Sequence, residues 1–288
     1  MLYITYTLNF VLMIGMPFLL AAFLARRLHV RWGLFWVGTV TFIGSQIVHI
    51  PFNALLGRLG LVPAAPPTSG WPLLELAIIL GLSAGVCEEL ARYLVLRFWL
   101  KRDRSWRSAL MFGAGHGGVE AVIFGTLAAI QTLNIFILRN IDPAKLGVPA
   151  DKVPAIQAQI ATAWNVPVLY PLLGAVERVS AISTHLFLAV LVMQVFIRRN
   201  TLFLAAAILW HALTDGVAVF AASTWGALPT EAAIGVLALV GLALLFALRT
   251  PEPIDAAPGE ATLPPPLASG PLPAGNASAD QLDRTRFQ

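Results

Sequence analysis

The sequence has few charged residues. Only 12% of its 288 residues are Asp, Glu, Lys or Arg, whereas 58% are apolar. Soluble globular domains carry about 25% charged residues, so this composition excludes an ordinary soluble domain. The composition therefore predicts an integral membrane protein.

Cysteine is almost absent as well. The single Cys87 excludes an intrachain disulfide framework. A lone cysteine in an apolar helix is more often an inert packing residue than a nucleophile. We therefore expect Cys87 to be a packing residue. The net charge is only +4, and the basic residues follow a membrane topology, so no nucleic-acid partner is predicted.

Seven apolar stretches are long enough to cross a hydrocarbon core, which takes about 20 helical residues. The sequence thus predicts an all-α fold, a polytopic transmembrane helix bundle surrounded by membrane lipid. The first stretch has no basic segment before it and is too long for a signal-peptide core, so we expect a retained membrane helix. The expected helices cover residues 3–25, 33–57, 73–99, 107–137, 168–197, 201–222 and 230–248.

The basic residues indicate the topology, because Lys and Arg accumulate in cytoplasmic loops. The odd-numbered loops and the tail contain Arg26, Arg27, Arg31, Arg97, Lys101, Arg102, Arg104, Arg107, Arg198, Arg199, Arg249, Arg284 and Arg286. The even-numbered loops contain only Arg58, Arg139, Lys145 and Lys152. We therefore expect the N-terminus outside and the C-terminus in the cytoplasm, with the bacterial plasma membrane as the location.

Two segments lie outside these helices. The longest loop, about residues 139–167, is expected to form a short amphipathic helix at the outer surface. Residues 250–288 are rich in Pro and Ala and cannot build a core, so they predict a disordered cytoplasmic tail. The expected domains are a transmembrane domain, 1–249, with a catalytic core over about 73–222, and this tail.

Seven charged residues fall inside the predicted helices, away from the helix ends. They are Arg92, Arg178, Glu88, Glu89, Glu120, Glu177 and Asp215. A charge near the bilayer centre costs at least about 2.5–3.5 kcal/mol, so this group needs mutual pairing, protonation or a cation. Because the acids outnumber the arginines, a bound metal or shared protons would account for the excess.

Three histidines join these charges on four helices. A spacing of four places Glu88 with Arg92, His116 with Glu120, and His211 with Asp215 on single helix faces, and a spacing of seven does so for Arg178 and His185. At a rise of about 1.5 Å per residue, the histidines and the paired glutamates share a depth of roughly 14–17 Å from the cytoplasmic ends. The pattern predicts one shared site.

The chemistry of this set fits metal-assisted hydrolysis. Neutral imidazoles from His116, His185 and His211 with a carboxylate suit zinc, and a second carboxylate can take a proton from water. Glu120 and Asp215 are expected to orient the imidazoles four residues before them. Adjacent helical residues point about 100° apart, so one of the paired glutamates can face the reaction while Arg92 or a neighbouring helix holds the other.

The ordered motifs "EELAR", "HGGVE", "ERVSAISTH" and "HALTD" resemble the YhfC-like family of intramembrane metalloproteases. That family is related to the type II CAAX prenyl endopeptidases and PrsW. The resemblance covers roughly residues 73–222 and implies that Glu88 activates water while His116 and His211 bind metal or stabilise an oxyanion. Asp215 departs from the CAAX endopeptidase pattern, so prenylated substrates are not implied. A glutamate and histidine pair that activates water without metal remains an alternative.

Other interpretations of these residues stay open. Glu88 and Arg92 can form a structural ion pair, and Glu177 with Arg178, near the outer interface, are expected to be structural or gating residues. His49 and Asn53 are expected to form a hydrogen-bonded helix contact. A proton- or metal-coupled transporter would also use intramembrane His and acids, but it would favour broken helices or inverted repeats.

Two further function classes fit less well. A bis-histidine haem protein would leave the acids without a role, and an inactive binding or immunity protein would tolerate loss of Glu88. The sequence therefore predicts an enzyme that hydrolyses a membrane-embedded or membrane-proximal peptide, within the membrane or at its cytoplasmic side.

Overall fold

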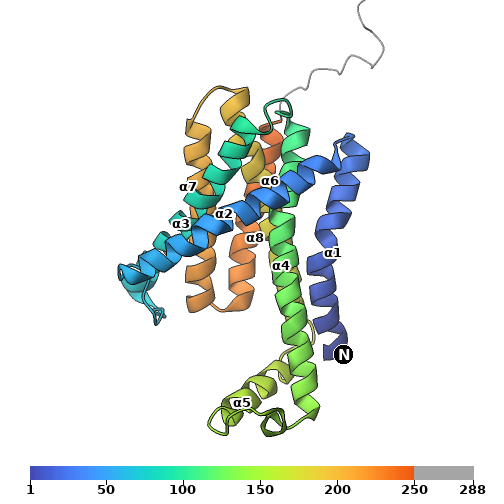
Figure 1. Cartoon of the computed structure of the whole chain (residues 1–288), viewed down its shortest axis with the longest axis vertical. Helices are drawn as coiled ribbons and strands as arrows, with labels where there is room; N and C mark the ends of the chain where they lie inside the picture. Colours follow the sequence, from blue (N-terminus) through green and yellow to red (C-terminus); the bar gives the residue numbers. More distant parts are fainter. Residues whose placement is uncertain (250–288) are drawn as a thin grey trace, which may run out of the picture. The chain divides into compact units, whose positions relative to one another are not determined.

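The computed structural model describes residues 1–249 and is helical, with no strand in that range (Figure 1). Seven helices are long and apolar enough to cross a membrane, as predicted, and the chain is a multi-pass membrane protein. The predicted tail, 250–288, lies outside the described residues. The helices are α1 (Leu2–Leu28), α2 (Trp32–Arg58), α3 (Gly70–Phe98), α4 (Trp106–Asn140), α5 (Val153–Trp164), α6 (Leu173–Ile197), α7 (Leu202–Thr224) and α8 (Ala227–Ala247).

Helix α5 is the expected short helix in the long loop. Helix α4 has 35 residues, more than the roughly 20 that a span requires, and its C-terminal end leads through the 3₁₀ turn η1 (Pro143–Leu146) into α5 (Figure 1). The guanidinium of Arg139 lies 3.8 Å from the ring centre of Trp164, and the hydroxyl of Tyr6 donates to the carbonyl of Ala163. These contacts hold α5 against the ends of α1 and α4.

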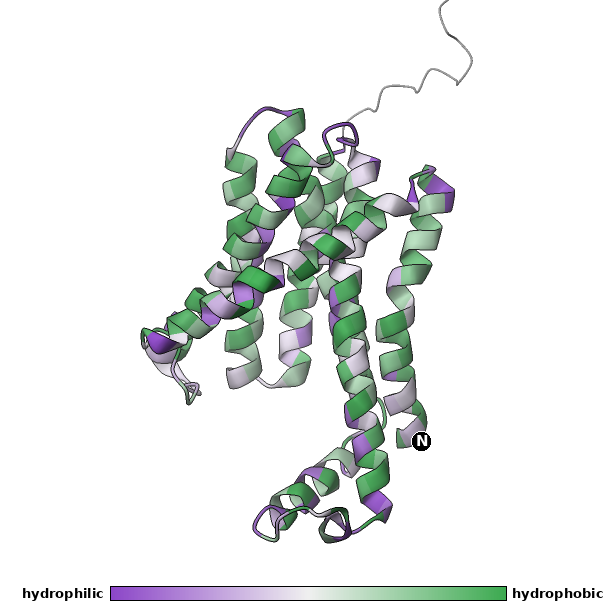
Figure 2. Cartoon of the chain, in the orientation of Figure 1, coloured by the Kyte–Doolittle hydropathy of each residue, from purple (hydrophilic) through white to green (hydrophobic). Residues whose placement is uncertain are grey.

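Helix α6 is the central helix of the bundle. In its most apolar window 72% of the residues are buried, against 39% or less in the other six spans. It packs against α1, α4, α7 and α8, while α3 packs mainly against α7 and α2. Residues along the helices are mostly apolar, and hydrophilic ones lie mainly at the helix ends and in the loops (Figure 2). Many large apolar side chains on the helices are exposed. This distribution is the one that a surrounding lipid phase favours.

Glycines bring α2 and α4 into close contact. A Cβ at Gly38 would collide with the carbonyl oxygen of Phe112, and one at Gly115 with that of Phe35. In the same α4 segment, a Cβ at Gly117 would lie 2.8 Å from the ring of His185. Small residues permit such close approach in membrane bundles, so the glycines around His116 set how near its ring lies to the facing helices.

Replacing Gly115 by alanine is therefore expected to force α2 and α4 apart and to lower the free energy of unfolding by about 1–3 kcal/mol. Gly44, on α2, is the matched control because a Cβ there has no neighbour within 4 Å. Gly44→Ala should leave stability unchanged or raise it slightly, because alanine is the better helix former. Thermal unfolding in detergent measures both, and equal behaviour of the two variants would contradict the close contact.

Candidate active site

Glu89 is the glutamate that Arg92 holds. Arg92 Nη1 donates to both carboxylate oxygens of Glu89 at 2.6 Å, and both side chains are completely buried. His211 Nδ1 lies 2.7 Å from the same carboxylate. The open alternative of an ion pair between Glu88 and Arg92 is not realised, because Arg92 binds Glu89, three residues before it. As expected, Arg92 holds one of the two adjacent glutamates. That residue is Glu89.

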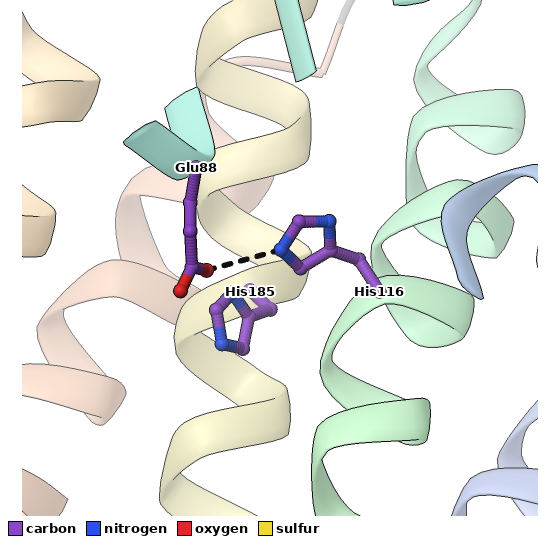
Figure 3. A group of neighbouring side chains, drawn as sticks. All are labelled: Glu88, His116 and His185. Atoms are coloured by element: carbon purple, nitrogen blue, oxygen red, sulfur yellow. Dashed lines mark hydrogen bonds and ion pairs between the residues drawn. The ribbon is translucent and has the colours of Figure 1, made fainter. Parts of the chain in front are cut away.

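Glu88 faces the other way, into the group of histidines (Figure 3). Its Oε2 atom lies 3.1 Å from His116 Nε2 and 3.9 Å from His211 Nε2. Its Oε1 atom accepts a hydrogen bond from Gln46 on α2 at 3.0 Å. Sequence reasoning missed Gln46, although its position three residues before His49 on one helix face was a usable signal.

His185 is held on both ring nitrogens. Arg92 Nη2 lies 3.2 Å from Nδ1, and Glu120 Oε2 lies 2.7 Å from Nε2. A guanidinium has only donors, so Nδ1 accepts from Arg92 and the proton sits on Nε2, which donates to Glu120. The expectation that Glu120 orients His116 is wrong, because its side chain reaches across to α6.

Glu177 and Arg178 connect to this network. Arg178 Nη1 donates to Glu120 Oε1 at 2.8 Å, and Nη2 donates to Glu177. Glu120 therefore bridges Arg178 and His185, which extends the hydrogen-bonded chain from Arg92 toward the start of α6. The structural or gating role expected of Glu177 and Arg178 stays a prediction.

His211 is oriented mainly by Glu89. Nδ1 donates to the Glu89 carboxylate, and Nε2 faces Glu88 Oε2 at 3.9 Å. Asp215 Oδ2 lies 3.5 Å from Nε2, and its side chain is 43% exposed. Asp215 therefore contacts the His211 ring from the same helix, as expected, while Glu89 on α3 is the closer partner.

Three side chains are close enough to share a metal ion. Potential ligand atoms of Glu88, His116 and His185 all lie within 4.8 Å of one another, and all three residues are buried. His116 Nδ1 is buried without a hydrogen-bond partner. A carboxylate with two imidazoles is a donor set that zinc prefers, and close acceptors of this kind need a shared proton or a cation. The residues fit a zinc site.

A polar cavity of about 90 Å³ reaches this group. Glu88 lines it, whereas Glu89 does not, so Glu88 is the paired glutamate that a substrate can meet. Small residues of α6 complete its wall, and sequence reasoning did not single them out. The lining residues are Glu88, Glu120, Glu177, Arg178, Ser180, Ala181, Thr184, His185, His211, Thr214, Asp215, Ala218 and Ile234.

Two residues singled out from the sequence lie beside the site. His49 contacts Gln46 Oε1 at 3.2 Å, Ser83 Oγ at 3.2 Å and Asn53 Nδ2 at 3.0 Å, which makes it the hydrogen-bonded contact between α2 and α3 that its spacing predicted. Cys87 is half-buried and is not among the residues that line the cavity.

Comparison with known proteins identifies the family. A model of the YhfC intramembrane metalloprotease family matches residues 11–238. An uncharacterized membrane protein YhfC of Bacillus subtilis (strain 168) is 37% identical over 139 residues, which cover 48% of this chain and 54% of that protein. The match thus spans about half the length of that relative, and no solved structure matches significantly. The chain belongs to the YhfC intramembrane metalloprotease family.

Proposed function

We propose that this chain hydrolyses a peptide bond in a membrane-embedded or membrane-proximal segment, with Glu88 as the general base and zinc as the assisting ion. One observation carries the proposal: Glu88 is a buried carboxylate that lines a polar cavity and lies within 4 Å of imidazole nitrogens from two other helices. A general base must lie within hydrogen-bond reach of the proton that it takes, and this position allows it.

The contacts of Glu88 define its proton chemistry. Gln46 donates to Oε1, which fixes the carboxylate plane and leaves Oε2 as the atom that takes a proton from water. His116 Nε2 lies 3.1 Å from Oε2, and Glu88 would pass the proton that it takes from water to the leaving amine. Glu89 is excluded from this role because its charge is already balanced by Arg92 and it has no access to the cavity.

The proposed zinc ligands follow from which ring nitrogens face Glu88. His116 and His211 would hold the ion beside Glu88, because the Nε2 atoms of both rings face Glu88 Oε2, at 3.1 and 3.9 Å. His185 is close enough to take part, but both of its nitrogens are bonded to Arg92 and Glu120, so it would support the site. When bound, zinc would supply Lewis-acid polarisation of the scissile carbonyl and of the attacking water.

The four helices that carry the site favour hydrolysis over transport. Transporters place their binding sites at discontinuous helices whose broken ends face the ion or substrate. Here α3, α4, α6 and α7 are each continuous through the residues of the site. The polar groups are all side chains, arranged around a carboxylate that water can reach.

The experiment that tests the proposal is cleavage in proteoliposomes. The purified chain is reconstituted with a library of single-span membrane peptides, and new N-termini are identified by mass spectrometry. We expect cleavage that a zinc chelator abolishes and that added zinc restores. Cleavage that continues unchanged after chelation would contradict the zinc mechanism, and no cleavage of any peptide by the zinc-loaded chain would contradict hydrolysis.

A further inference from the structure

The cavity extends in one direction only from the histidines. Its lining residues on α6 all fall within 177–185, between the start of that helix and His185. Its lining residues on α7 all fall within 211–218, between His211 and the end of that helix. Consecutive antiparallel helices place these two segments side by side (Figure 1), so both walls run toward the same end of the bundle over about 10–12 Å.

The opposite end is closed by the apolar core. On α6, every residue from Phe187 to Met193, just beyond His185, is at most 6% exposed. On α4, the residues before His116 belong to the same buried layer. Ala109, Met111, Phe112 and Ala114 are completely buried. The core cluster continues on the same side with Leu96 of α3, Leu100 just after that helix, Leu34 and Phe35 of α2, and Ala207 of α7. Buried apolar side chains therefore fill the layer between Glu88 and that end of the bundle.

The closed end is the end that carries the arginines. The loops beyond it contain Arg31, Arg102, Arg104, Arg198 and Arg199. Such loops are cytoplasmic by the distribution of positive charge. The open end is that of the loop between α7 and α8, residues 225–226, which has no Lys or Arg. The cavity therefore opens away from the cytoplasm.

One side chain marks the inner end of the cavity as a binding position. Thr184 lines the cavity next to His185, is only 5% exposed, and its hydroxyl has no hydrogen-bond partner. A buried hydroxyl without a partner is rare and indicates a water or ligand group that completes it. A volume of about 90 Å³ holds on the order of six waters, at roughly 10–15 Å³ each.

We infer that water and the substrate reach Glu88 from the extracytoplasmic side, through this cavity between α6, α7 and α8. The substrate class is then a membrane protein whose scissile bond lies in the outer half of the bilayer or in the extended segment that follows it. This differs from the cytoplasmic side expected from the sequence. That the occupant is a peptide rests on the proposed function, whereas the direction of access rests on the cavity alone.

Cysteine accessibility in sealed membranes tests the direction. Cys87→Ala provides a cysteine-free chain, into which Ser180→Cys on α6 or Ala218→Cys on α7 is introduced, both on the cavity wall. Two exposed positions are the controls, Ser223→Cys at the open end and Thr201→Cys at the arginine-rich end. A charged maleimide, which does not cross the hydrocarbon core, is added to right-side-out or to inside-out vesicles.

Both cavity cysteines should react from the same side as the Ser223 position, at least about tenfold faster than from the side that labels Thr201. Labelling from the Thr201 side would overturn the inference, and so would no labelling of either cavity position while both controls react. Total labelling after denaturation shows that each chain is present, and two positions on different helices guard against one misfolded variant. Since no turnover is required, the result stands apart from the peptide-hydrolysis proposal.

Discussion

Replacement of Glu88 by glutamine is expected to slow peptide hydrolysis by about 10²–10⁴-fold, the contribution typical of a general base. Glutamine keeps the size of the side chain and can still contact Gln46 and His116, but it cannot take a proton. The bundle should therefore remain folded, because the buried pair of Glu89 and Arg92 is untouched. The initial rate of fragment formation in proteoliposomes measures the effect.

Glu75→Gln is the matched control, because Glu75 lies on the same helix but is exposed. The control should hydrolyse peptide at the wild-type rate. A Glu88→Gln variant within about twofold of wild type would remove Glu88 from the role of base, since a loss of that size is below the usual range for general-base catalysis. Retained thermal stability in both variants separates a chemical effect from unfolding.

Replacement of Arg92 by methionine is expected to cost about 3–5 kcal/mol of unfolding free energy, because it leaves a buried carboxylate without its counter-charge. Arg92 is completely buried and donates to Glu89 and to His185. A second change, Glu89→Gln in the same chain, should recover part of the loss because it removes the orphaned charge. Unfolding in a denaturing detergent titration gives both values.

The exposed ion pair of Arg31 with Asp103 supplies the control for this prediction. Its nitrogen and oxygen lie 2.7 Å apart, but the Arg31 side chain is 75% exposed. Arg31→Met should therefore cost only about 0–1 kcal/mol, the range for exposed pairs. Similar losses in the two methionine variants, or no recovery by Glu89→Gln, would show that the buried pair is not what stabilises the centre of the bundle.

The seven spans could be predicted because hydropathy and length alone determine which segments cross a bilayer. The clustering of histidines and acids in one site could be predicted too. An unpaired charge inside a membrane is costly, so such residues pair with one another. The hydrogen-bond partner of each side chain in the site could not be predicted. Periodicity places Glu120 on the face of His116, but only the neighbouring helix shows that its carboxylate reaches His185.

Other features of the site depend on helix rotation. Whether Arg92 binds Glu88 or Glu89 differs by one residue on a helix, about 100°, which spacing does not resolve. Thr184 is one of many threonines in apolar helices, and its unpartnered hydroxyl is visible only once the packing of α6 is known. The direction in which the cavity opens likewise follows from the packed core, which the sequence does not locate.

The measurement that tests the central claim most directly is the zinc content of the purified chain after zinc loading and mild chelation. We expect about one zinc per chain in the wild type, loss of zinc in His116→Ala and in His211→Ala, and retention in His185→Gln, whose amide can still accept from Arg92 and donate to Glu120. Absence of zinc in the wild type, or retention in His211→Ala with loss in His185→Gln, would contradict a metal held by His116 and His211 beside Glu88.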